Sequence, residues 1–344
     1  DGCVSTTAED REIVRLLALH TEASSPQPNG HLELLRTTEG IFAPENLDRV
    51  LNDMKLPPPA SNNGDTTAAI AYDWLRNGGK RFRPFMFLGT HAALLTPDSP
   101  RPAKNGLDNL TPGVQAIAVA LEALHKASLA HDDIADNDAF RYGADTLHRK
   151  HGVAMALDVG DHLVGLGDRL VVAAGAALGA DTTNAILANL AESHLALCRG
   201  QGEELVLQEN PGKPVDAKTV LTIYAQKTAP AFTVALHAGA ATAGRERRFH
   251  DLFSRFSKDL GVGYQILNDL DDWRTFRHDK RIAGQDGMAR RPTILRAFAM
   301  EKYSPRDEEA LGRRMRDADA AEQLRLLRAF YTEAGAFERP EALL

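Results

Sequence analysis

The feature that most constrains this chain is a helical spacing of apolar residues that continues through almost its whole length. Apolar side chains recur every three to four residues in long runs, which is the pattern of helices that bury one face. We find no convincing apolar–polar alternation of the kind that a β-strand shows. The spacing therefore predicts an all-α protein. The main helices are expected over residues 66–77, 84–95, 114–136, 152–177, 184–206, 220–243 and 249–272.

The order of helices and loops indicates one structural domain. Segments 22–31 and 57–65 are rich in Pro, Ser, Asn and Gly, which is typical of surface linkers. No repeat and no change of composition marks a domain border. We expect residues 1–65 to form an N-terminal helical and linker segment that packs on a helical domain of residues 66–344. A single helical bundle with its site between facing helices is the simplest arrangement.

Composition and charge exclude several classes of function. The net charge of −7 disfavours nucleic acid as a partner, because phosphate backbones require a basic face. Two cysteines, Cys3 and Cys198, provide neither a disulfide framework nor a thiol metal site. No apolar run approaches the ~20 residues that cross a bilayer, so no integral membrane segment is expected. The first ten residues lack the basic and apolar parts of a signal peptide, and we expect a cytoplasmic protein.

An acidic cluster ends the predicted helix 114–136. Asp132 and Asp136 are four residues apart, so their carboxylates share one helical face, and Asp133 lies between them. Carboxylates this close repel one another unless a cation neutralises them. Oxygen ligands without His or Cys favour magnesium over zinc. A lone cluster of this kind is more often a solvated helix end.

A second acidic cluster makes the metal hypothesis stronger. Asn268 and Asp272, again four residues apart and with Asp269 between them, close the predicted helix 249–272. Two helices that end in oxygen ligands could point at a common gap, where magnesium ions would bind. Magnesium usually takes substrate phosphate as part of its shell. The pair of clusters therefore predicts a diphosphate ligand.

Basic residues near these clusters suit a diphosphate. Lys80 and Arg83 follow the flexible pair Gly78-Gly79, and a point charge beside a guanidinium fork is a sensible combination for phosphates. His125 lies seven residues before Asp132, hence on the same helical face. Each of these has a plainer explanation, a surface basic turn for the first two and a buried core residue for His125. Further basic candidates are Arg141, Lys227 and Lys280.

The motifs occur together in an order that one known family shares. The chain resembles the trans-isoprenyl diphosphate synthases, or polyprenyl synthetases, over roughly residues 66–293. The short DDIAD form looks most like the geranylgeranyl and longer-chain branches. The matching segments are GGKRFRP at 78–84, EALHKASLAHDDIAD at 122–136, TLHRKHG at 146–152, GD at 160–161, GQGEEL at 200–205, QKTA at 226–229 and GYQILNDLDD at 263–272.

This resemblance implies an isoprenoid-synthase-type bundle with a central active-site cavity, and a homodimer. It implies an allylic diphosphate and isopentenyl diphosphate as substrates, and about three Mg²⁺ ions with substrate bound. The implied metal ligands are Asp132, Asp133 and Asp136 on one side, with Asp269, Asp272 and Asn268 on the other. Isopentenyl diphosphate would be held by Lys80, Arg83 and His125. The leaving diphosphate would contact Arg141, Lys227 and Lys280, and the allylic cation would be stabilised by Gln265 and the Lys227-Thr228 segment.

The chain departs from the family pattern at a few positions. Tyr142 stands where the family usually has a second arginine for isopentenyl diphosphate, and losing one charge-assisted contact costs about 1.5–3 kcal/mol, or one to two decades of affinity. Lys126 is a nearby candidate to replace it, but it lies about a quarter turn from His125, so we expect only a minor role for it. Asn268 replaces an aspartate, although an amide oxygen still ligates magnesium and class I terpene cyclases commonly use Asn there. Asp145 replaces a usual proline, and we find no mechanism for that change. The stretch from Asp272 to Lys280 is slightly shorter than is usual in the family.

Product length is expected to depend on the residues one turn before the first aspartate of the cluster. In the family this position floors the hydrocarbon pocket. Here Ala127 and Ser128 occupy it, with Leu124 a further turn down. Small residues leave a deeper channel, so we expect a product of C20 or longer, unless an aromatic such as Phe85 or Phe87 closes it.

Two other functions remain open beside chain elongation. One is an enzyme of the same fold that ionises an allylic diphosphate but cyclises or condenses it irregularly, as Tyr142 and Asn268 would suit. The other is a non-catalytic subunit that modulates a true synthase, although its metal ligands should then have been lost. The retained basic residues and acidic clusters favour elongation over both.

Overall fold

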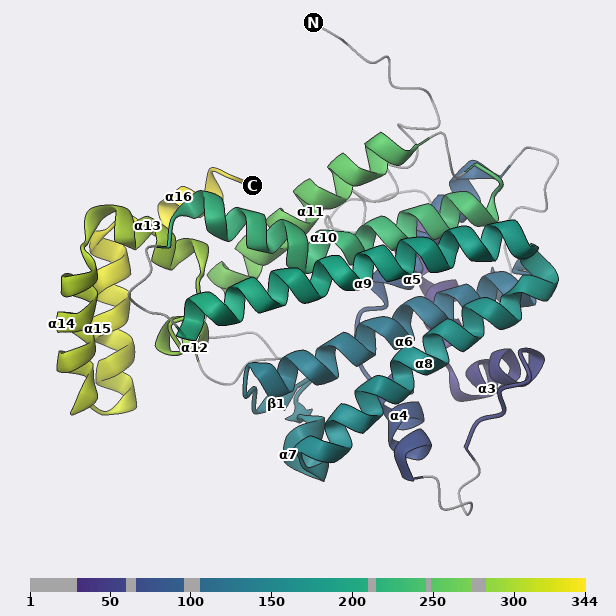
Figure 1. The fold of residues 1–344 in the computed structure, drawn as a ribbon, viewed down its shortest axis with the longest axis horizontal. Coiled ribbons are helices and arrows are strands. Elements are labelled where there is room, and N and C mark those ends of the chain that lie inside the picture. Colours follow the sequence, from purple (N-terminus) through teal and green to yellow (C-terminus); the bar gives the residue numbers. More distant parts are fainter. Residues whose placement is uncertain (1–29, 60–65, 96–105, 210–214, 246–248, 274–282) are drawn as a thin grey trace, which may run out of the picture. The chain divides into compact units, whose positions relative to one another are not determined.

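The computed structural model describes residues 30–59, 66–95, 106–209, 215–245, 249–273 and 283–344 (Figure 1). Helices dominate, and the all-α prediction is confirmed. Among the described residues, no helix is long and apolar enough to cross a membrane. The cytoplasmic location stays a prediction.

The described chain forms two compact units. The first unit holds the described residues up to Ala191 together with Phe232–Phe253, and the second unit holds Glu192–Ala231 and Ser254–Leu344. The borders fall within three long helices. They are α9 (Ala180–Glu209), α10 (Ala217–Thr242) and α11 (His250–Asp271). The prediction of a single structural domain, with an N-terminal segment over residues 1–65, stays a prediction.

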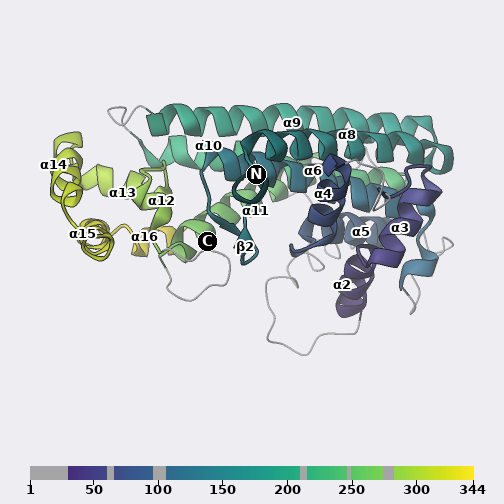
Figure 2. The ribbon, with the colours of Figure 1, turned by 90° about the horizontal axis from the view of Figure 1, so that it is seen from below.

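The first unit is layered around one helix, α6. α8 packs along one side of α6, whereas α5 and then α2 lie on the opposite side (Figures 1 and 2). Thr111 is the N-cap of α6, and its hydroxyl accepts a hydrogen bond from Val114 N–H at 3.3 Å. Every residue from Gly113 to Ala123 is buried. The elements of this unit are α2 (Gly30–Ile41), α3 (Pro44–Asp53), α4 (Thr66–Arg76), α5 (Phe82–Leu94), η1 (Gly106–Asn109), α6 (Pro112–Ala135), α7 (Leu147–His151) and α8 (Val153–Leu178).

Glycine allows α8 to approach α6 closely. A Cβ atom on Gly167 would lie 2.7 Å from Leu124 Cγ, and one on Gly160 would lie 2.2 Å from the His131 ring. Real Cβ contacts are essentially never that short, so a larger residue at either position would push the helices apart. The close packing fixes the half of α6 that carries the first acidic cluster.

A short hairpin, which the sequence pattern did not predict, follows α6. β1 (Phe140–Arg141) pairs antiparallel with β2 (Ala144–Asp145), in the stretch between the helices expected over residues 114–136 and 152–177. Two-residue strands are too short to show alternation. Tyr142 and Gly143 form the turn with φ of 54° and 77°, the positive pair that suits a two-residue hairpin.

The second unit has its own apolar core. Trp273 lies edge-on to Tyr331 and Phe337, with ring centroids 5.4 and 5.5 Å apart. Ile266 and Leu270 of α11 pack into the same core. The remaining helices are α12 (Gln285–Met288), α13 (Ile294–Lys302), α14 (Pro305–Arg316), α15 (Ala320–Glu333) and α16 (Glu338–Glu341).

Candidate active site

The first acidic cluster lies at the C-terminal end of α6, in the first unit. α6 ends at Ala135 and Asp136 is its C-cap. Asp132 and Asp136 are partly exposed, one turn apart, whereas Asp133 is fully buried. The cluster therefore has two partly exposed carboxylates and one buried carboxylate.

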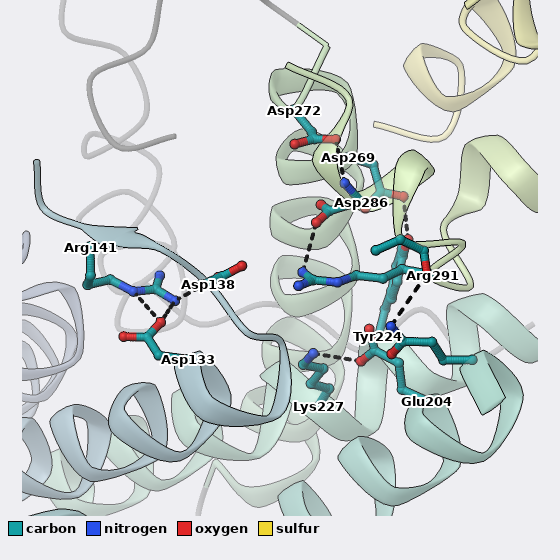
Figure 3. Close-up of polar contacts among 12 residues, drawn as sticks. Asp133, Asp138, Arg141, Glu204, Tyr224, Lys227, Asp269, Asp272, Asp286 and Arg291 are labelled. Atoms are coloured by element: carbon teal, nitrogen blue, oxygen red, sulfur yellow. Dashed lines mark hydrogen bonds and ion pairs between the residues drawn. The ribbon is translucent and has the colours of Figure 1, made fainter. Parts of the chain in front are cut away.

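The buried carboxylate of Asp133 is held by Arg141 (Figure 3). Arg141 Nε donates to Asp133 Oδ1 at 2.9 Å, and its Nη2 lies 3.5 Å from Asp138 Oδ2. Burial raises the pKa of Asp133 to about 6, against the effect of Arg141. Asp133 Oδ2 is buried without a hydrogen bond, so one ligand-type oxygen is still available. Asp138 joins this ion pair although the sequence analysis gave it no role.

A cationic region surrounds His125 in the same unit. Burial lowers the pKa of His125 well below its ordinary value, and the charges of Arg83, Lys126, Arg141 and Arg81 lower it further. His125 is therefore neutral at physiological pH. The Arg83 guanidinium lies over the Phe232 ring, 5.2 Å from its centroid, and Lys80 is exposed. The structure thus places Arg83 and His125 in one electrostatic neighbourhood.

The loop before α5 needs its two glycines. Gly78 and Gly79 have φ of 69° and 91°, values that side chains rarely adopt. Arg81, at φ 51°, points inward and forms a buried ion pair with Glu122, at 2.7 Å. This pair fixes the loop on α6. Sequence reasoning missed both partners, and the only signal was two charged residues inside otherwise matching motifs.

The second acidic cluster closes α11 in the second unit (Figure 3). Asp269 is 5% exposed and accepts a hydrogen bond from the Tyr224 hydroxyl. The backbone N–H of Ile294 donates to Asp269 Oδ2 at 2.8 Å. Burial raises the pKa of Asp269 to about 8. Asp269 is thus an internal anchor between α10, α11 and α13.

The other two oxygen donors of this cluster differ in exposure. Asn268 is exposed, whereas Asp272 is 4% exposed and accepts a hydrogen bond from the backbone N–H of Asp286 at 3.1 Å. The Asp286 carboxylate in turn accepts one from Arg291 at 2.8 Å. The amide of Asn268 is therefore the most accessible oxygen among the three predicted ligands of this cluster.

The predicted cation-stabilising residues lie together in the second unit. Gln265 Nε2 on α11 donates to Thr228 Oγ1 on α10 at 2.6 Å. Lys227 Nζ pairs with Glu204 Oε2 on α9, also at 2.6 Å. Gly200 allows α9 to approach α10 closely, because a Cβ on Gly200 would lie 2.8 Å from Lys227 N. The glutamate was part of a matched segment, but the sequence analysis gave it no role.

Three predicted pocket residues lie one to two turns before the acidic cluster of α6. Ala127 is 1% exposed and belongs to the buried face, with Ala130 and Asp133. Ser128 and Leu124 are partly exposed, and their spacing places them on the face of Asp132. Phe85 and Phe87 are buried in α5. Lys280 lies outside the described residues.

The oxygen donors fit magnesium by their chemistry. Carboxylate and amide oxygens are the ligands that this ion prefers. Within the described ranges, no three His, Cys, Asp or Glu side chains are grouped closely enough to hold a metal ion. Bound magnesium commonly keeps water and substrate phosphate in its shell. Asp133 Oδ2 is the one donor that the structure leaves buried without a hydrogen bond in the first cluster.

Comparisons with known proteins identify the family of this chain. Residues 65–331 match the family model for polyprenyl synthetases. A geranylgeranyl diphosphate synthase of Cereibacter sphaeroides is 30% identical over 254 residues, covering 71% of this chain and 78% of the relative. An all-trans-nonaprenyl-diphosphate synthase of Rhodobacter capsulatus is 27% identical over 303 residues, covering 87% of this chain and 86% of the relative.

Solved structures show the same fold. The geranylgeranyl pyrophosphate synthase of Corynebacterium glutamicum, complexed with isoprenyl diphosphate and magnesium, matches with a TM-score of 0.72 at 22% identity, covering 90% of this chain and 89% of that one. The expected isoprenoid-synthase-type fold is thereby confirmed. With more than half of its length matched by the family model, this chain belongs to the polyprenyl synthetase family of prenyltransferases.

Proposed function

We propose that the protein condenses an allylic diphosphate with isopentenyl diphosphate to give an all-trans prenyl diphosphate of C20 or longer, with magnesium as cofactor. The observation that carries the proposal is at the end of α6. There Asp132 and Asp136 are partly exposed, in the same unit as the cationic region of Arg83 and His125. One feature suits a metal-bound diphosphate and the other suits a second diphosphate, as a two-substrate condensation requires.

The proposal requires the two acidic clusters to face a common cavity. Asp132 and Asp136 on one side and Asn268 and Asp272 on the other would hold about three Mg²⁺ ions on the allylic diphosphate. When bound, magnesium supplies Lewis-acid stabilisation of the charge that develops on the departing diphosphate. A crystal structure with magnesium and an unreactive allylic analogue tests the arrangement. Asp132 and Asn268 on separate surfaces without an intervening ligand would contradict it.

The chain's own residues would act on both products of ionisation. Arg141 and Lys227 would stabilise the leaving diphosphate by preorganised charge, together with Lys280. Gln265 donates its amide N–H to Thr228, and its carbonyl oxygen would stabilise the carbocation. The new C–C bond forms between the allylic cation and the isopentenyl alkene. This bond leaves a carbocation on the isopentenyl unit, which loses a proton from the adjacent carbon to the departed diphosphate, so no protein base is required.

Product length would be set by the outward face of α6. Ser128 and Leu124 share the face of Asp132, whereas Ala127 is packed inside. Ser128→Phe should therefore shorten the product by at least one C5 unit. Ala127→Phe is the matched comparison, and by its burial it should lower stability more than it changes product length. An unchanged product with Ser128→Phe would remove this face from the pocket.

We also propose a homodimer. Three large apolar side chains on α8 are about half exposed, and an interface would cover them. They are Val153 at 50%, Leu157 at 45% and Val172 at 51%. Sedimentation equilibrium of the parent and of Leu157→Glu tests this proposal. The variant should dissociate into monomers. A monomeric parent would contradict the proposal.

The activity test uses labelled isopentenyl diphosphate, magnesium and each allylic starter from C5 to C20. Elongated products are expected, with their lengths read by chromatography. Release of diphosphate without elongation would favour a cyclase or an irregular synthase. No turnover of any starter by folded protein would favour a non-catalytic subunit. Asp132→Asn serves as the inactive control.

A further inference from the structure

Tyr142 occupies the tip of the hairpin that follows the first acidic cluster. Its ring packs on the glycine pair before α5, because a Cβ on Gly78 would lie 2.6 Å from Tyr142 Cδ2. The hydroxyl of Tyr142 lies 3.3 Å from where a Cβ on Gly79 would be. A neutral ring thus borders the loop that carries Lys80, at the position where the family pattern has a cation.

A cation lies directly against that ring. Lys126 Nζ is 4.3 Å from the Tyr142 ring centroid and 4.5 Å from the Trp74 ring centroid. The side chain of Lys126 is fully buried, and its ammonium donates to the carbonyl oxygen of Asn77 at 2.6 Å. The long stem lets Lys126 reach this place although its Cα is a quarter turn from that of His125. Lys126 therefore brings a charge to the base of the glycine loop.

The charge of Lys126 is less compensated than that of two neighbouring cations. Arg81 is paired with Glu122 at 2.7 Å, and Arg141 is paired with Asp133. In the part of the chain that the structure describes, Lys126 forms no such ion pair; a carbonyl and two ring faces contact its ammonium. Lys126 thus adds net positive potential next to His125.

We propose that Lys126 replaces the missing arginine as a positioning residue for isopentenyl diphosphate, acting through the glycine loop and its own positive field rather than by direct contact. The inference rests on the proposed function, because it assumes that Lys80, Arg83 and His125 bind that diphosphate. Trp74 and Tyr142 also line a cavity of about 870 Å³, and Lys126 is not among its lining residues.

The electrostatics of the site agree with such a role. Burial lowers the pKa of Lys126 to about 7, and Arg81 and Arg141 lower it while Glu122 and Asp133 raise it. Tyr142 faces the ammonium as a neutral phenol, since burial raises its pKa to about 12. A nearby diphosphate favours the charged lysine, so substrate binding and protonation of Lys126 would support each other.

The test moves the charge from one residue to the other. Lys126→Met should raise KM for isopentenyl diphosphate by about tenfold or more, with kcat and the allylic KM changed less than about threefold. Lys126→Gln keeps a donor for Asn77 O without the charge, and should raise the same KM. Tyr142→Arg combined with Lys126→Met should return KM to within about threefold of the parent. Tyr142→Arg alone puts two cations together and should lower the melting temperature instead.

Controls separate this inference from the proposed function. Lys150→Met removes an exposed lysine on α7 that lines the same cavity, and KM for isopentenyl diphosphate should not change. Binding of isopentenyl diphosphate is also measured by calorimetry, which reports the role of Lys126 without turnover. A parent that binds this ligand but does not elongate would overturn the proposed function alone. An unchanged KM and affinity in folded Lys126→Gln, or no recovery in the folded double variant, would overturn the role of Lys126. If Lys126→Met does not fold, two other measurements test the role of Lys126. One is the KM of Lys126→Gln for isopentenyl diphosphate. The other is the affinity of the parent for isopentenyl diphosphate from pH 6 to 9, which should weaken as the lysine loses its proton.

Discussion

The two acidic clusters resemble each other in sequence but are held in different ways. In both, the central aspartate is buried, Asp133 in the first unit and Asp269 in the second. Asp133 is paired with the guanidinium of Arg141, whereas Asp269 accepts from a phenol and a backbone N–H, both neutral (Figure 3). Burial accordingly raises the pKa of Asp133 only to about 6 but that of Asp269 to about 8.

This difference assigns separate tasks to the residues of one motif. A central aspartate that is buried and hydrogen-bonded inside the protein orients the helix end, and its more exposed neighbours are the accessible donors for ligands. In the first cluster those neighbours are the carboxylates Asp132 and Asp136, whereas in the second the most exposed of the three predicted donors is the amide of Asn268. The first cluster therefore brings more negative charge to the proposed metal ions.

The largest expected effect follows from that asymmetry. Asp132→Asn should lower kcat at least a hundredfold, because a charged ligand of the diphosphate-bound metal is lost. Asn268→Asp, the reciprocal change in the other cluster, should alter kcat by less than about tenfold. Steady-state rates at saturating magnesium measure both, with circular dichroism to verify folding. A folded Asp132→Asn variant that retained a third of the parent rate would mean that the clusters are not unequal in this way.

The second prediction concerns the ion pair beneath the first cluster. Asp133→Asn leaves the partly buried Arg141 without its main carboxylate, and should lower the free energy of unfolding by about 2 kcal/mol. Urea denaturation measures the difference. Asp145→Asn, an exposed change on the same hairpin, should stay within about 0.5 kcal/mol of the parent. Equal stability of the two variants would show that Arg141 does not depend on Asp133.

The third prediction concerns the neutral bonds beneath the second cluster. Tyr224→Phe removes the hydroxyl that donates to Asp269 and accepts from Ile294 N–H at 2.9 Å, and should cost about 1–2 kcal/mol. Tyr303→Phe removes a hydroxyl that donates to Glu333 at the surface, and should cost less than about 0.5 kcal/mol. A larger loss for Tyr224→Phe than for Asp133→Asn would reverse the comparison between the clusters.

Sequence reasoning located the helices well because helical spacing is a local signal. The helix expected over residues 114–136 is observed as Pro112–Ala135, and the one expected over 249–272 as His250–Asp271. The hairpin at Phe140–Asp145 was missed, because its strands are too short for any periodicity and its turn contains Tyr142 where a glycine or asparagine would have signalled it.

The partners of the site residues were not predictable in the same way. That Asp269 meets Tyr224, or that Lys227 meets Glu204, depends on which helix faces which, and no local pattern records it. The same applies to Lys126. Its distance along the helix from His125 suggested a minor role, whereas the length of its side chain places the ammonium on the Tyr142 ring.

Lys126 yields the most gradual of the expected effects, a dependence of stability on pH. Its pKa is about 7 in the folded protein, below the ordinary lysine value of 10.5. The folded state therefore releases this proton at a lower pH than the unfolded state does. Below pH 7 the buried charge lowers the stability of the folded state by its full amount, and this loss disappears as the pH rises to 10.5. Lys126→Gln removes that loss, and its stability relative to the parent should fall between about pH 7 and 10 by at most about 1.4 kcal/mol per pH unit. Urea denaturation at pH 6, 8 and 10 measures the trend, and the exposed Lys150→Gln should show none. A constant difference for Lys126→Gln would mean that the lysine stays charged throughout, and the field that we assign to it near His125 would then be independent of pH.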